Sequence, residues 1–319
     1  MRGRKEALER LATRRRRKLG AMSEQAFEEL SLAVAKQPEA FVEDDADRAF
    51  LRLVDALEAY DARAAEDEFL DDDAYEASYS ARRERLDGAC REVLAQDPNC
   101  LDARVVHAQL SGSEAGDVLE RLLAIEGGQP KLGHEGTDAW DDVFARPRLR
   151  LRAAIARGYL DTTRFRPASR ACARLVEASP SDMVGARFTW SLACARLEDE
   201  EAFNALDAKF ARQGNAWSHI ARILLMFKLD RMSAARRALK GFAGLCEGGA
   251  YALLRPAFVD TYLPDRPSFR PGSYKEAVLA VHEADPIVVD TPDFVAWATA
   301  QSGVSDAAQR FAEDHDLDW

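Results

Sequence analysis

Residues 147–180, PRLRLRAAIARGYLDTTRFRPASRACARLVEASP, decide the fold class of this chain. One apolar stripe at helical spacing runs from Leu151 to Tyr159, and a second runs from Ala168 to Leu175. Only a short polar break separates the two stripes. We therefore expect two antiparallel helices that are joined as a hairpin.

Two more blocks follow at an offset of about 34 residues, the period of tetratricopeptide repeats, and extend the pattern to residue 246. Small residues fall where stacked helix pairs approach closely, at Ala156, Ala168, Ala202 and Ala235. An ordinary helical bundle with accidental spacing is the alternative; we favour the repeat because period, paired stripes and proline positions agree. The apolar stripes of the second and third blocks contain Phe188, Leu192, Ala195, Phe203, Leu206, Phe210, Ile220, Ile223, Leu224, Phe227, Ala235, Leu239 and Phe242.

The fold class that we expect is all-α: a tetratricopeptide-like helical-hairpin solenoid with an N-terminal helical extension and C-terminal capping helices. Its segments are a basic N-terminal arm (1–20), an acidic helical extension (21–81), the helical repeats (82–246) and a C-terminal helical cap (247–319). A cap is needed because the last repeat of a solenoid otherwise exposes its apolar face.

The N-terminal arm carries nine Lys or Arg against two Glu and includes the basic run from Arg14 to Lys18. A partly helical arm in solvent is the interpretation we favour, because no aromatic residues are interleaved for base stacking. The acidic segment between Glu39 and Glu76 is expected to be a solvated face or a flexible connection, with folding back onto the arm as the alternative.

Capping residues place several further helices. We expect helices to begin at Ser181 or Asp182, at Ser273, at Thr291 followed by Pro292, and at Asp306, one helix to run from Arg82 to Pro98, and another to contain Trp140, Val143 and Phe144.

Composition restricts the class of protein. The net charge of −11 and the pI of about 5.1 argue against general affinity for nucleic acid, which needs many exposed cations. The longest apolar run, from Ala216 to Leu229, is too short and too charged to span a membrane, so we expect a core helix there and no membrane association. Five scattered cysteines and the lack of a secretory signal indicate the cytoplasm.

The sequence contains no recognisable catalytic chemistry. The five histidines have neither metalloprotease nor Cys/His ligand spacing, and no phosphate-binding loop or nucleophile elbow occurs. His134, Glu135 and Asp138 lie close together in the chain, but a polar loop explains them more simply than a metal site. We expect a protein that is not an enzyme and holds no cofactor or metal.

A resemblance to a known family rests on short motifs in a fixed order. These are DPNCLDA (97–103), Trp140, Arg146-Pro147 with Arg150, Pro180-Ser181-Asp182 with Gly185 and Arg187, Pro271-Gly272-Ser273 with Glu276, Thr291-Pro292 and Trp297. Across residues 82–300 the chain resembles a family of bacterial tetratricopeptide repeat proteins related to the animal suppressor of tumorigenicity 7 family. The resemblance implies a helical repeat scaffold.

Two functions from different classes fit this picture. The first is a protein–protein interaction scaffold that binds a peptide or partner helix in the concave groove of the solenoid. The alternative is an RNA- or ribosome-associated factor that acts through the basic N-terminal arm. Binding that weakens steeply with salt and is lost on removal of residues 1–20 would favour the alternative.

Arginines on the first helices of neighbouring pairs are the candidate binding residues. Arg150 and Arg157 are expected to project from their helix away from its apolar stripe, and Arg187 takes the matching surface of the next block. Guanidinium groups there suit an acidic peptide; pairing with local acids such as Asp161 and Asp182 is the alternative. With Arg146, which the resemblance adds, the candidates are Arg146, Arg150, Arg157 and Arg187.

Circular dichroism is expected to show a nearly all-helical protein, because no period-2, β-branched run occurs outside residues 287–289. A substantial sheet signal would contradict the solenoid.

Overall fold

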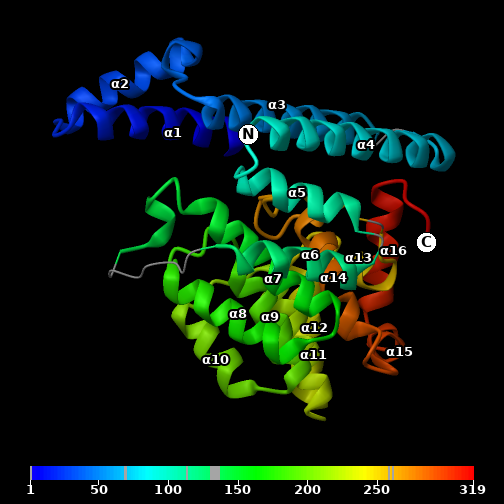
Figure 1. Ribbon diagram of the computed structural model, residues 1–319. Helices are drawn as coiled ribbons and strands as arrows, with labels where there is room; N and C mark the ends of the chain where they lie inside the picture. Colours follow the sequence, from blue (N-terminus) through cyan, green and yellow to red (C-terminus); the bar gives the residue numbers. More distant parts are fainter. Residues whose placement is uncertain (1, 68–69, 113, 130–136, 258, 261) are drawn as a thin grey trace. The chain divides into compact units, whose positions relative to one another are not determined.

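A computed structural model describes residues 2–67, 70–112, 114–129, 137–257, 259–260 and 262–319 (Figure 1). Within these ranges the regular elements are sixteen α-helices and short 3-10 turns, so the all-α expectation is confirmed for the described residues. The chain divides into two compact units, Met1–Leu151 and Arg152–Trp319. This division differs from the expected segment boundaries at residues 20, 81 and 246, and each unit is described by itself.

The first unit is built from helices that pack as neighbours along the chain, notably α1 with α2, α3 with α4, and α5 with α6 (Figure 1). Its helices are α1 (Arg2–Leu19), α2 (Glu24–Lys36), α3 (Asp45–Glu66), α4 (Asp72–Gln96), α5 (Leu101–Ser111), α6 (Ala115–Gly127) and the first turns of α7 (Arg146–Asp161), with 3-10 turns at Pro38–Phe41 and Ala139–Asp141. The helix expected from Arg82 thus begins ten residues earlier, where the side chain of Asp71 accepts a hydrogen bond from the N–H of Ala74.

The basic segment is not a free arm. In α1, Ala7, Leu11 and Ala12 are buried in a cluster that also contains Phe50 and Val54 of α3. Acidic side chains of the following segment pair with its cations, through Arg4–Asp55, Arg14–Asp47, Arg15–Glu43 and Lys18–Glu43. The interpretation as a solvated arm is therefore wrong. The alternative, in which the acidic segment folds back onto the arm, describes this unit.

A single 3-10 turn, Ala139–Asp141, replaces the helix expected around Trp140. The carboxylate of Asp138 accepts a hydrogen bond from the N–H of Trp140, and that of Asp142 accepts one from the N–H of Phe144. Aspartates that bond to the backbone two residues ahead stabilise turns at the expense of helix, which explains the difference.

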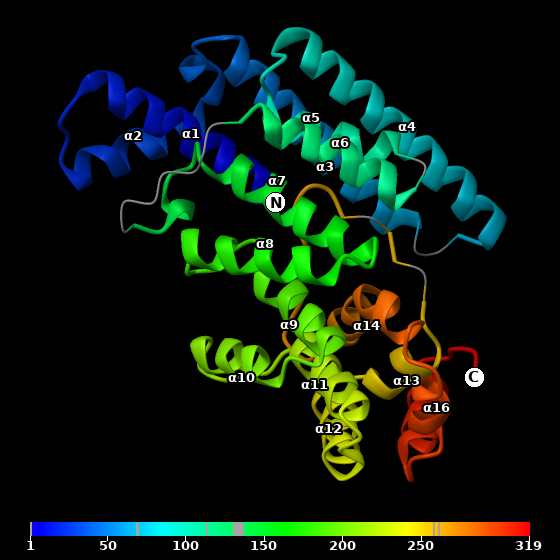
Figure 2. The same ribbon diagram turned by 60° about the horizontal axis from the view of Figure 1, so that its bottom comes forward.

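The second unit contains the helix pairs that the sequence predicts. With α7 they are α8 (Phe165–Ala178), α9 (Ala186–Leu197), α10 (Glu200–Lys209), α11 (Ala216–Lys228) and α12 (Met232–Leu245). Figure 2 shows these helices as successive neighbours, and α8 packs on α9, α9 on α11, and α11 on α12. Most stripe positions are buried as expected: Ile155, Ala168, Cys172, Leu175, Leu192, Ala195, Phe203, Leu206, Ile220, Ile223, Leu224, Ala235, Leu239 and Phe242.

Two details of the repeat stretch differ from expectation. Phe188 and Phe227 are partly buried, because each packs at the margin of the core beside another aromatic ring. Helix α9 begins at Ala186 instead of directly after Asp182. Gly185 at its N-cap has φ = 69°, a conformation that favours glycine, and the carboxylate of Asp182 still accepts hydrogen bonds from the first N–H groups of the helix.

The C-terminal cap consists of α13 (Gly249–Leu254), α14 (Tyr274–Val288), α15 (Phe294–Thr299) and α16 (Val304–Asp314). Ser273 caps α14 as expected, since its side chain accepts a hydrogen bond from the N–H of Glu276. Thr291 does not cap the next helix: its hydroxyl donates to the carbonyl of Ile287, and Asp293 precedes α15 instead. Contacts of α14 are with α11, α13 and α9, and α16 packs mainly on α13.

Membrane spanning has no support in the described helices, since none combines the necessary length with sufficient apolar character.

Truncation of Phe242 to Ala should lower the free energy of unfolding by about 3–5 kcal/mol, because this ring is completely buried in α12. Urea unfolding followed by circular dichroism measures the change. The control is Leu245→Ala at the end of the same helix, where the side chain is 66% exposed and a change within about 0.5 kcal/mol is expected. Equal effects of the two substitutions would show that this core is misassigned.

Candidate functional site

In the second unit, α14 lies along the first helices of two pairs, α9 and α11 (Figure 2). The segment between Arg255 and Gly272, which precedes α14 and which we call the strap, contributes Tyr262 and Arg266 to the same region. Its residues 258 and 261 lie outside the described part of the chain. A face that could serve as a groove between first helices is therefore covered by the chain itself at this point.

The carboxylate of Glu283, in α14, is the centre of this packing and is 1% exposed. Four side chains from three other segments donate to it or pair with it. They are Trp217 Nε1 at 2.7 Å, the Tyr262 hydroxyl at 2.7 Å, Arg266 through Nε at 2.9 Å, and Arg157 at 3.3 Å. One carboxylate thus joins α7, α11, the strap and α14.

Burial by itself would raise the pKa of Glu283. The charges of Arg266 and Arg157, with the hydrogen bonds from Arg266 and Tyr262, outweigh that effect and lower the pKa to about 2. The group is therefore an ionised anchor and is unsuited to exchanging protons near neutral pH.

Arg266 also attaches the strap to the beginning of α9. Its guanidinium donates to the carbonyl of Gly185 at 2.7 Å and to the hydroxyl of Thr189 at 3.0 Å, and it lies over the rings of Phe188 and Trp217. A Cβ atom at position 185 would come within 2.7 Å of this guanidinium. Space and backbone conformation thus both favour glycine here.

The four arginines predicted as binding residues fall in different surroundings. Arg146 and Arg150 belong to the first unit, and Arg157 and Arg187 to the second. Arg146 is bidentate to Glu9, with distances of 2.7 and 2.8 Å, and also donates to the carbonyl of Trp140.

The expectation that Arg150 projects outward is wrong, because its side chain is 4% exposed. It donates to both oxygens of Glu6 in α1, at 2.9 and 2.8 Å, and to both oxygens of Asp102 in α5, at 2.8 and 2.7 Å. Arg10 adds a third set of donors to the same two acids. Although burial opposes it, the charges of Arg150 and Arg10 lower the pKa of Asp102.

Pairing with local acids, the alternative for Arg157 and Arg187, is confirmed. Arg157 lies 2.6 Å from Asp161 besides its contact with Glu283. Arg187 lies 3.7 Å from Asp182, a distance that is an ion pair without a hydrogen bond. Burial raises the pKa of Asp182 to about 6, against the lowering effect of its two helix N–H bonds and of Arg187. The pairing at Arg187 is therefore the loosest of the four.

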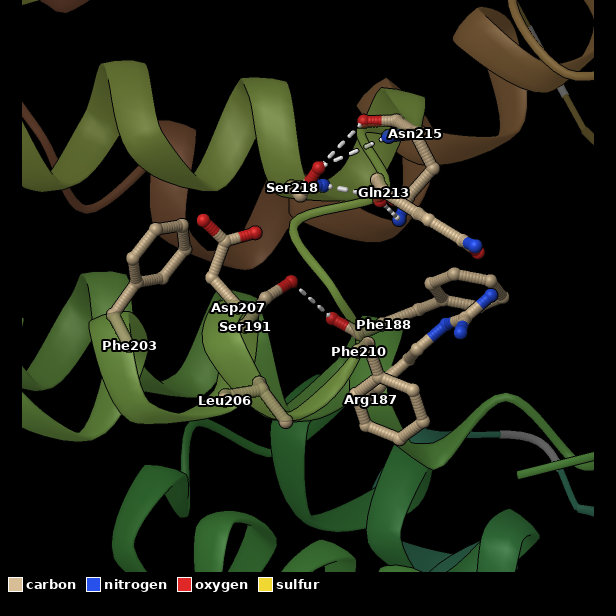
Figure 3. A pocket seen from close by; sticks show the side chains of 10 residues that line it. All are labelled: Arg187, Phe188, Ser191, Phe203, Leu206, Asp207, Phe210, Gln213, Asn215 and Ser218. Carbon is tan, nitrogen blue, oxygen red and sulfur yellow. Dashed lines mark hydrogen bonds between the residues drawn. The ribbon is translucent and has the colours of Figure 1, made fainter. Parts of the chain in front are cut away.

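A small pocket lies beside Arg187, between α9, α10 and α11 (Figure 3). Its lining residues are Arg187, Phe188, Ser191, Phe203, Leu206, Asp207, Phe210, Gln213, Asn215 and Ser218. The Arg187 guanidinium carbon is 4.9 Å from the centre of the Phe188 ring and 4.8 Å from that of Phe210. The cation is thus held by two aromatic rings at the rim of an apolar hollow.

Most polar groups of the pocket already have partners. Asn215 and Ser218 bond to each other as the capping box of α11, and Asp207 pairs with Arg222 at 2.9 Å. By contrast, no guanidinium N–H of Arg187 donates a hydrogen bond to a described residue, and its Nε is buried without an acceptor there. Among the described residues, the guanidinium of Arg187 is thus a charged donor of this pocket without a hydrogen-bond acceptor.

Sequence reasoning selected Arg187 and Phe210 separately, and missed Gln213, Arg266 and the central role of Glu283. An arginine followed directly by Phe188 was a local signal of the stacked cation. No sequence signal indicates Glu283, because its partners lie at irregular separations of 17 to 126 residues along the chain.

Metal and thiol chemistry have no support in the described part of the chain. No group of three or more His, Cys, Asp or Glu there could hold a metal ion. His134 and Glu135 lie outside the described residues. The five cysteines are free and buried, and burial raises the pKa of Cys90 and Cys194 to about 12, so that these thiols stay protonated.

Comparison of the chain with protein-family models, curated proteins and solved structures finds no match in any of the three. The family resemblance drawn from the sequence therefore stays a prediction.

Replacement of Glu283 by Gln should lower the free energy of unfolding at pH 7 by about 3–5 kcal/mol, because it leaves Arg266, whose side chain is 9% exposed, without its anion. Folding lowers the pKa of Glu283 from its ordinary value of 4.5. The ionised carboxylate therefore stabilises the folded state fully above pH 4.5, and this contribution is lost as the pH falls toward about 2.

The difference between the two proteins should accordingly shrink as urea unfolding is repeated at decreasing pH below 4.5. Glu201→Gln, at an exposed position of α10, serves as the control. A difference that is independent of pH would contradict the ionised anchor.

Proposed function

We propose that this chain is a non-catalytic protein–protein interaction scaffold, a tetratricopeptide-like helical solenoid that binds an acidic peptide segment. Support for the scaffold comes from the consecutive helices α8 to α12, in which α9 packs on α8, α10 and α11, and α11 packs on α12, and which bury most of the stripes that define the repeat period. Its buried, free cysteines fit a reducing compartment such as the cytoplasm.

The surroundings of the Arg187 guanidinium are the observation that supports an acidic peptide as the ligand. Its guanidinium is fixed between Phe188 and Phe210, yet donates no hydrogen bond to a described residue. A fixed cation loses little conformational entropy on binding, and a guanidinium fork matches a carboxylate in bidentate geometry. Its side chain is 29% exposed, so a ligand can reach its outer part.

The surface next to Arg187 suits a peptide better than a free ion. Phe203, Leu206 and Phe210 give the pocket an apolar wall, while the amide of Gln213 lies on the same side as the guanidinium (Figure 3). A carboxylate side chain on Arg187 with an apolar neighbour against this wall would use both features. The covering of α9 and α11 by α14 and the strap directs the peptide to this edge, away from the face between first helices.

The alternative, an RNA- or ribosome-associated factor working through residues 1–20, has less support. Seven of the nine cations in that segment pair with carboxylates within the first unit: Arg4, Arg10, Arg14, Arg15, Arg16, Arg17 and Lys18. Phosphates would have to replace these acids, which reduces the gain from counterion release.

An immobilised library of short peptides, in which Glu and Asp alternate with apolar residues, tests the proposal against a matched library with Gln and Asn. We expect the chain to bind members of the acidic library, and Arg187→Glu to weaken that binding at least about tenfold, because a charge-assisted pair contributes about 1.5–3 kcal/mol.

Arg236→Glu is the matched control, since it makes the same charge change at an exposed position of α12 away from the pocket. Circular dichroism and melting temperature show whether each variant is folded. Equal binding of both libraries, or equal loss in both variants, would mean that Arg187 does not select a carboxylate.

A further inference from the structure

The first unit contains an open cavity of about 360 Å³ that the proposed scaffold function does not use. It lies where α1, α3, the beginning of α5 and the beginning of α7 meet, all within residues 1–151. Three arginines line it: Arg10 and Arg14 from α1, and Arg148 from α7. Its volume is within the range of about 300–1,000 Å³ that is usual for small-molecule sites.

The cavity also has three aspartates, but two of them are already neutralised. Asp102 accepts two hydrogen bonds from Arg150 and one from Arg10. Asp47 lies 3.0 Å from Arg14 and accepts the N–H of Glu43 at 3.1 Å. The third, Asp97, accepts the N–H of Asn99, which also lines the cavity.

The donors, by contrast, are not all used. Arg148 forms no ion pair or side-chain hydrogen bond with any residue that the structure describes, although it is only partly exposed. Nε of Arg10 is buried without an acceptor among the described residues, while the same guanidinium stacks 3.5 Å from the centre of the Phe50 ring. Helix α5 also begins at the cavity without a side-chain cap on its first N–H groups.

We propose that this cavity binds a small molecule through an oxyanion group, a phosphate or a carboxylate, with Arg148 as its principal contact. Arg148 supplies a guanidinium fork that no described residue engages. Arg10 and the uncapped start of α5 add further positive potential where the oxyanion would lie. The aromatic rings of Phe50 and Phe144, which also line the cavity, would accommodate the remainder of the molecule.

Isothermal titration of the full chain with inorganic phosphate and with succinate, each against sodium chloride at the same ionic strength, tests the site. We expect saturable binding of at least one oxyanion. Arg148→Gln should weaken oxyanion binding about tenfold or more, because it removes a charge-assisted contact. The affinity of Arg148→Lys should lie between those of the original chain and of Arg148→Gln, since lysine keeps the charge but lacks the guanidinium fork.

Arg52→Gln, on an exposed position of α3, is the control and should bind like the original chain. The oxyanion that binds identifies the chemical source, phosphate or carboxylate. Failure of both to bind saturably overturns the proposal, and so does binding that Arg148→Gln leaves unchanged. Neither result bears on Arg187, which is in the other unit.

Discussion

One buried carboxylate determines how the second unit is put together. Glu283 is withdrawn from water, and an ionised group there is tolerated only if cations and hydrogen-bond donors replace its hydration. Arg157 of α7, Trp217 of α11, and Tyr262 and Arg266 of the strap meet that requirement. The position of α14 on α9 and α11 therefore depends on a polar condition as well as on apolar burial.

The first unit applies the same principle with the signs distributed differently. Glu6 and Asp102 are buried acids from α1 and α5, and Arg150 and Arg10 satisfy both of them. Removing one member of such a network is strongly destabilising, because it leaves a buried charge without a partner. Replacing all of its members by well-packed apolar side chains often costs little stability. The network ties α1 to α5 and to the start of α7, because Glu6 and Asp102 share the donors of Arg150.

Local physics explains which parts of this fold could be predicted. The stripe from Leu151 to Tyr159 and those that follow it are periodic over a single helix, and the structure has helices there. The start of α9 shows where local prediction fails. The helix begins after Gly185 instead of after Asp182, because Gly185 takes a left-handed conformation and its carbonyl accepts a hydrogen bond from Arg266, 81 residues along the chain. Arg150 shows why a charged side chain could not be assumed to be exposed. Its acids lie 48 and 144 residues away, and periodicity carries no information about such separations.

The pairing of arginines with acids also determines which of them can bind a ligand. Three of the four predicted arginines already bond to acids of their own unit, at distances of 2.6–2.9 Å. Arg187 differs because its carboxylate, Asp182, is held by the N–H groups of Ala186 and Arg187 at the start of α9, so that it cannot also bond to the guanidinium. Two rings then fix the cation without using its donors.

A single charge-assisted pair between Arg187 and a ligand carboxylate contributes about 1.5–3 kcal/mol, which corresponds to a dissociation constant far weaker than 1 mM. Binding of a peptide must therefore also draw on the apolar wall of α10 beside it, and it is the combination of a fixed cation with that wall that makes this edge selective.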